Sequence, residues 1–83
     1  MYVPEATLTH QTAAAQLAAG IAAIDAGQAE FSLEQTRQID SSAVACLLEW
    51  KRHANQRGVK LTFQHLPQNL THLIQLYGVE QLL

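Results

Sequence analysis

The sequence predicts a small α/β domain with a mostly parallel sheet and three helices. Extended and helical segments alternate along the chain, in the order strand, helix, strand, helix, strand, helix. Strands that are joined by helical crossovers pair in parallel with right-handed connections. The chain has 83 residues, enough for one domain and too few for two. We therefore treat residues 1–83 as one domain.

The composition is that of a folded domain that does not bind nucleic acid. Hydrophobic residues make up 48% of the chain and charged residues 14%, which argues against disorder. This low charge either reflects apolar surface that a partner covers or follows from an alanine-rich helix. The net charge is −2, and the five Lys and Arg residues do not form the basic patch of a nucleic-acid binder. One cysteine excludes an intrachain disulfide and fits a reducing compartment.

The first part of the chain predicts an edge strand followed by a helix. Residues 2–8 are weakly extended, and Pro4 places this segment at a sheet edge because proline cannot donate to the ladder. Residues 10–26 have helical spacing, with Thr9 as the candidate N-cap and Gly27 after the last turn.

Within this first helix, Leu17, Ile21 and Ile24 fall on one face. Gly20 lies inside the helical pattern, where glycine costs about 1 kcal/mol relative to alanine. We expect Gly20 to allow a neighbouring element to approach closely.

The middle of the chain predicts a strand, a polar connection and the second helix. Residues 29–33 form the strand, and residues 34–38 the connection. The second helix begins at Ser41 or Ser42 and ends at Gln56, with Asp40 or Ser41 as its N-cap. Its core-facing stripe consists of Val44, Leu47, Leu48 and Ala54, and the apolar face is widened by Ala43, Cys46 and Trp50.

The last third predicts a strand and the third helix. Residues 59–64 alternate with period two, with one sheet face covered less well than the other. Pro67 suits the first position of the third helix, and Gly78 ends it. The apolar positions of this helix are Leu70, Leu73, Ile74 and Tyr77.

The junction Asp40-Ser41-Ser42 is the best candidate for function, and two interpretations apply to it. It is either an ordinary helix N-cap with a spare serine, or it exposes a hydroxyl that a partner or a kinase recognises. A phosphate on this hydroxyl would add a charge of about −1.5 to −2 and would meet the free amides of the helix N-terminus.

The segment FSLEQTRQIDSSAVACLL, residues 31–48, resembles the signature of STAS domains, in which a strand and a connection lead to Asp-Ser/Thr at the start of a helix. RGVKL at 57–61 and LIQLYGV at 73–79 resemble the family too, so the likeness covers residue 28 to the end. It implies a non-catalytic module for binding or regulation, without a cofactor.

The resemblance implies one of two alternative protein partners, and the choice between them stays open. The compact size and the Leu-Tyr-Gly-Val ending resemble the small STAS subunit of Mla-type phospholipid-transport ABC systems, which binds the ATPase subunit. The alternative is an anti-sigma-factor antagonist, in which Ser41 matches the residue that the partner kinase phosphorylates. The chain departs from the family at Ala43, where glycine is common, and in the N-terminal hairpin strand, which is shortened or missing. An open sheet edge would then need a partner or a second copy, so a homodimer is also considered.

The partner-binding residues that follow from this resemblance and from the second helix are Asp40, Ser41, Ser42, Ala43, Cys46 and Trp50. Two of them have a simpler interpretation, since Trp50 suits the core and Cys46 suits a buried, inert thiol. An enzyme that uses Cys46 or a histidine is the remaining alternative. The histidines, at 10, 53, 65 and 72, lack metal-ligand spacing and are expected at the surface, solvated or hydrogen-bonded.

The N-terminus has no basic region followed by an apolar run, so it is not expected to be a signal peptide. No apolar stretch approaches the roughly 20 residues that a membrane-spanning helix needs. We expect a cytoplasmic protein that does not insert into the membrane.

Overall fold

A computed structural model describes all residues from Met1 to Leu83. The strands are β1 (Thr7–Leu8), β2 (Glu30–Ser32), β3 (Gln38–Ile39) and β4 (Thr62–Gln64), and the helices are α1 (Ala13–Asp25), α2 (Ser41–Gln56) and α3 (Gln68–Tyr77). A short 3₁₀ helix, η1 (Glu80–Leu82), follows α3. None of the helices has the length and apolar character that crossing a bilayer requires.

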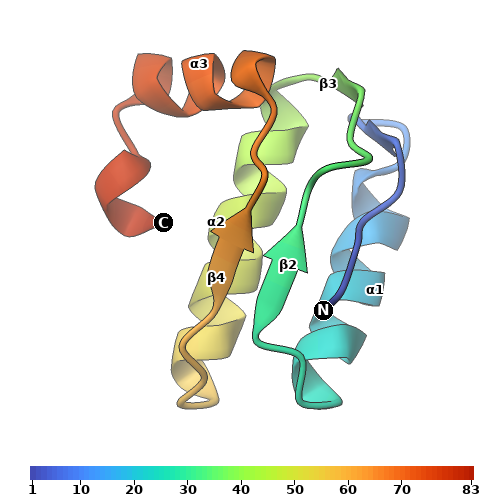
Figure 1. The fold of residues 1–83 in the computed structure, drawn as a ribbon, viewed down its shortest axis with the longest axis vertical. Helices are drawn as coiled ribbons and strands as arrows, with labels where there is room; N and C mark the ends of the chain where they lie inside the picture. Colours follow the sequence, from blue (N-terminus) through green and yellow to red (C-terminus); the bar gives the residue numbers. More distant parts are fainter.

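All strand pairs are parallel, as predicted. Leu8 in β1 lies opposite Ile39 in β3, and Phe31 in β2 lies opposite Phe63 in β4. An isolated parallel bridge also joins Tyr2 to Phe31. The N-terminal segment therefore runs beside residues 30–39, and β4 lies on the other side of β2 (Figure 1). No antiparallel hairpin is present in residues 1–83, consistent with the expected α/β class.

Two helices cover one face of this sheet. α1 and α2 lie side by side behind β2 and β4, and α3 crosses the end of α2 at the top of the view (Figure 1). The other face has no helix, and its side chains are polar. Glu30 and Thr62 there are exposed, and the Gln64 amide donates to the Glu30 carboxylate at 3.3 Å. The predicted difference between the two sheet faces is confirmed.

Phe31 is the centre of the core. Its ring is fully buried and meets Trp50 edge-on with the ring centroids 5.2 Å apart. Tyr2 and Phe63 pack against the same ring at 4.7 and 6.1 Å. Such aromatic pairs stabilise a fold beyond the area that they bury. This aromatic cluster therefore joins the sheet to α2.

Some predicted boundaries are wrong for local reasons. α1 begins at Ala13 and not at residue 10, because the Thr12 hydroxyl accepts a hydrogen bond from the Thr9 amide and donates one to the Thr7 carbonyl. These bonds hold residues 9–12 in a turn. Pro67 is the N-cap of α3 and not its first residue. Tyr77 is 51% exposed and not a core residue of α3.

Candidate functional site

Asp40 caps the N-terminus of α2. β3 ends at Ile39, and Asp40 then takes an extended conformation. Its carboxylate oxygen Oδ1 accepts a hydrogen bond from the Ser42 amide at 2.8 Å. Its backbone carbonyl accepts another from the Ala43 amide at 3.0 Å. Of the two N-caps that the sequence left open, Asp40 is therefore the correct one.

The second carboxylate oxygen of Asp40 binds His10. Oδ2 accepts a hydrogen bond from the His10 backbone amide at 3.0 Å and lies 2.9 Å from Nδ1 of the His10 ring. The parallel register explains this meeting, because Leu8 lies opposite Ile39 and the segments that follow both strands emerge at the same edge. His10 was expected at the surface, but its place beside Asp40 was not predicted from the sequence.

These hydrogen bonds keep the Asp40 carboxylate ionised. The His10 amide, then the His10 ring and the Ser42 amide, hold the pKa of Asp40 well below its ordinary value. A carboxylate that accepts several N–H bonds is stabilised in its charged form. The N-terminus of α2 thus carries a fixed negative charge next to the positive end of the helix dipole.

Ser41 is the exposed residue of the junction. It is the first residue of α2 and lies at the surface, whereas Ser42 is half-buried. The expectation that a phosphate on Ser41 would find free amides is wrong at two positions, since Asp40 already binds the amides of Ser42 and Ala43. A phosphate there would instead face the negative charge of Asp40.

Comparison with known families identifies the family to which this fold belongs. The family model described as "Mlab, STAS domain" matches residues 5–83. The chain belongs to the STAS family. The comparisons found no match among curated proteins and none among solved structures. STAS domains are generally non-enzymatic modules that mediate protein–protein interactions.

Three residues that were expected to contact a partner lie instead in the core of the STAS domain. Ala43, Cys46 and Trp50 have exposed fractions of 3% or less, because α1 covers this side of α2. They cannot form an exposed patch with Ser41. The fold supports the alternative interpretation, in which Trp50 is a core residue and Cys46 is a buried thiol. The Ala43 methyl group is covered as well, so alanine in place of glycine adds no atom to the surface.

The buried positions explain how α1 is placed. Trp50 Nε1 donates to the Leu17 carbonyl at 3.1 Å. A Cβ atom added at Gly20 would lie 2.2 Å from the same nitrogen, which confirms the expected close approach at this glycine. The Cys46 thiol lies 3.8 Å from the Ala13 carbonyl, and burial raises its pKa. A raised pKa makes a thiol less reactive.

A second polar cluster lies at the opposite end of α2. Asp25 at the end of α1 binds His53 Nε2 at 2.9 Å and lies 3.5 Å from Arg57 Nε. The His53 hydrogen bond, with the Arg57 charge as a smaller cause, lowers the pKa of Asp25. This cluster ties the C-terminal turns of the two helices together. No group of three His, Cys, Asp or Glu side chains is suitably placed to hold a metal ion.

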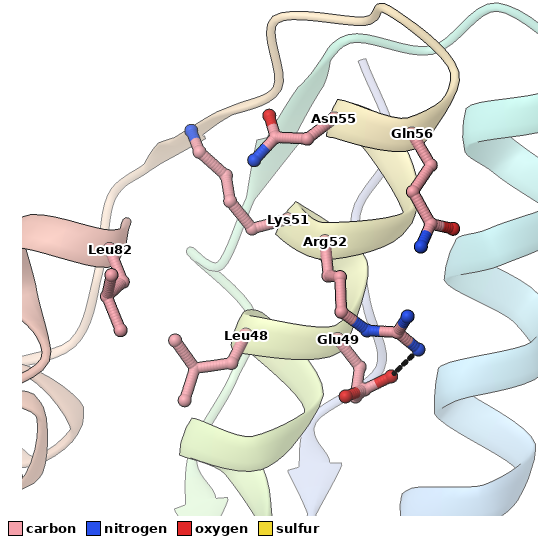
Figure 2. Close-up of a pocket in the computed structure, with 7 residues that line it drawn as sticks. All are labelled: Leu48, Glu49, Lys51, Arg52, Asn55, Gln56 and Leu82. Carbon is pink, nitrogen blue, oxygen red and sulfur yellow. Dashed lines mark hydrogen bonds and ion pairs between the residues drawn. The ribbon is translucent and has the colours of Figure 1, made fainter.

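An open cleft of about 490 Å³ lies between the outer side of α2 and η1 (Figure 2). Leu48 and Leu82 are its apolar walls, and Leu82 is 62% exposed. Its charged groups already have partners. Arg52 pairs with Glu49 at 2.7 Å, and the Lys51 ammonium donates to the Leu61 carbonyl. The sequence did not predict this cleft, because it depends on where the C-terminal tail folds back.

Proposed function

We propose that this STAS domain is a non-catalytic accessory subunit that binds the ATPase of an Mla-type phospholipid-transport ABC transporter. Its docking point is the surface formed by Asp40, Ser41 and Ser42. The observation that carries the proposal is the exposed Ser41 at the first turn of α2 in a chain that matches the family described as "Mlab, STAS domain". Because the ATPase of such a transporter works in the cytoplasm, we place the domain there too.

The geometry of the docking point suits recognition by a protein. Ser41 presents a small side chain, so the backbone of a partner can approach closely. The Asp40 carboxylate has its orientation set by three N–H groups, from Ser42 and from the amide and ring of His10. A fixed charge costs little further ordering when a partner binds. We expect the partner surface to be neutral or positive where it faces Asp40.

Co-purification with the ATPase subunit tests this proposal. Ser41→Glu adds a larger, charged side chain at the docking point and should abolish co-purification. Gln68→Glu is the matched control, because Gln68 is also exposed and is the first residue of a helix, α3. This control should bind as the unaltered protein does. Retention of the ATPase by Ser41→Glu would contradict the proposal.

The second candidate is an anti-sigma-factor antagonist that is switched by phosphorylation of Ser41. The exposed hydroxyl favours it, and the added charge of about −1.5 to −2 would stand beside the ionised Asp40. Phosphorylation would then disrupt an interface that is complementary to the unmodified serine. Incubation with the cognate kinase and ATP, followed by mass spectrometry, should locate phosphate at Ser41. An unmodified Ser41 under these conditions would count against this function.

A further inference from the structure

The His10 ring has two nitrogen atoms, and the chain uses one of them. Nδ1 lies 2.9 Å from Asp40 Oδ2. An ionised carboxylate can only accept hydrogen bonds, so Nδ1 carries the hydrogen atom of this pair. In a neutral imidazole, the other nitrogen, Nε2, is then a hydrogen-bond acceptor. The His10 side chain is 76% exposed, so the ring is open to a partner.

The orientation of this ring is set by its hydrogen bond to Asp40, and further bonds hold the loop that carries His10. The His10 amide and the His10 ring both donate to the same oxygen of Asp40. The Thr12 hydroxyl holds the rest of the loop through the Thr7 carbonyl and the Thr9 amide. The α2 cap itself uses the other Asp40 oxygen, Oδ1, so capping does not require the His10 ring. An exposed imidazole of fixed orientation therefore lies at the start of α2.

We propose that His10 is a specificity-determining residue of the docking point, and that its Nε2 accepts a hydrogen bond from an N–H or O–H group of the partner. This inference rests on the proposed function. It adds a residue from a separate part of the chain and states what the partner has to supply. A partner with only acceptor groups at this place would leave Nε2 unpaired and would bind less tightly.

Two substitutions at His10 separate its two nitrogen atoms. In His10→Asn, the side-chain amide nitrogen takes the place of Nδ1 and still donates to Asp40, but no atom takes the place of Nε2. His10→Ala removes both groups. At about pH 8, where imidazole is ordinarily neutral, calorimetry with the purified ATPase subunit should show affinity lower by about fivefold for His10→Asn, the effect of one hydrogen bond. Its thermal midpoint should stay unchanged, whereas that of His10→Ala should fall.

Unchanged affinity in a folded His10→Asn would overturn the inference. Ser41→Glu, measured in the same series, shows which claim has failed. If Ser41→Glu abolishes binding while His10→Asn does not weaken it, the docking point stands and the role of His10 is wrong. If neither substitution weakens binding, the docking point itself is wrong. Nitrogen NMR of the labelled ring gives a check without the partner, since a hydrogen on Nε2 in place of Nδ1 at about pH 8 would also overturn the inference.

Discussion

Asp40 connects the start of α2 with the loop before α1 through one side chain. Its Oδ1 atom caps the first turn of α2, and its Oδ2 atom binds His10 in the loop before α1. Ser41, the next residue, lies at the surface. Only a short carboxylate offers two acceptors at this distance from the helix. Asparagine is about as good an N-cap, but it has one acceptor oxygen and no charge. The residue therefore contributes to stability and, in our proposal, to recognition.

The lowered pKa of Asp40 predicts a loss of stability in acid. A carboxyl group whose pKa is lower in the folded chain than in the unfolded chain stabilises the fold at pH values above its unfolded pKa. For Asp40 this unfolded value is the ordinary 3.8. This stability is lost as the pH falls toward the folded pKa. Urea unfolding midpoints should therefore decrease as the pH is lowered from about 5 to about 2.

The matched variant for this pH dependence is Asp40→Asn, which cannot titrate. Its midpoint should change less with pH over the same range. Some dependence should remain, because the pKa of Asp25 and that of Glu49 are also lowered, by His53 and Arg52 respectively. An equally steep dependence in Asp40→Asn would show that Asp40 does not contribute.

At the scale of elements, the pairing of α1 with α2 depends on one glycine. Gly20 lies against the indole of Trp50, and this contact brings the Leu17 carbonyl within reach of Trp50 Nε1. Trp50 in turn packs on Phe31 of β2. A change at this helix crossing therefore reaches the sheet. The same change at the contact between Gly20 and Trp50 should also shift the start of α2 relative to the loop that contains His10.

Gly20→Ala should destabilise the domain. Alanine gains about 1 kcal/mol in helix propensity, but a Cβ atom 2.2 Å from Trp50 Nε1 overpacks the core, which typically costs about 1–3 kcal/mol. We expect a net loss of up to about 2 kcal/mol in the free energy of unfolding, measured with urea. In a Trp50→Phe background the smaller ring leaves room, so Gly20→Ala should be neutral or stabilising. The same loss in both backgrounds would refute this explanation.

The elements that were predicted best from the sequence are those with capping residues at their ends. Asp40 and Gly78 mark the ends of α2 and α3 by capping, and both helices were placed to within a residue. β3 was not predicted as a strand, because a strand of two residues exists only through its pairing with β1. α1 was predicted to begin too early, since the side-chain bonds of Thr12 that end the preceding turn leave no periodic pattern.

At the scale of the whole molecule, the same limit applies to the candidate site. Ser41 could be found because Asp-Ser-Ser before a helical pattern is a local signal. His10 lies 30 positions from Asp40 and enters the site through the register of β1 with β3. Burial decided against Cys46 and Trp50, because spacing along α2 cannot show which side α1 covers. The candidate surface for recognition is therefore smaller than predicted, and in our proposal it includes a residue from another segment.

A partner could bind at any of the three surfaces described above, and the proposed function requires one of them. They are the docking point at the start of α2, the cleft near Leu82, and the polar sheet face with Thr62. NMR titration of the isotope-labelled domain with the unlabelled ATPase subunit distinguishes these surfaces most directly. We predict that the amide signals of His10, Ser41 and Ser42 shift or broaden first. Changes at Asn55 in the cleft or at Thr62 on the sheet, with Ser41 unaffected, would contradict the account.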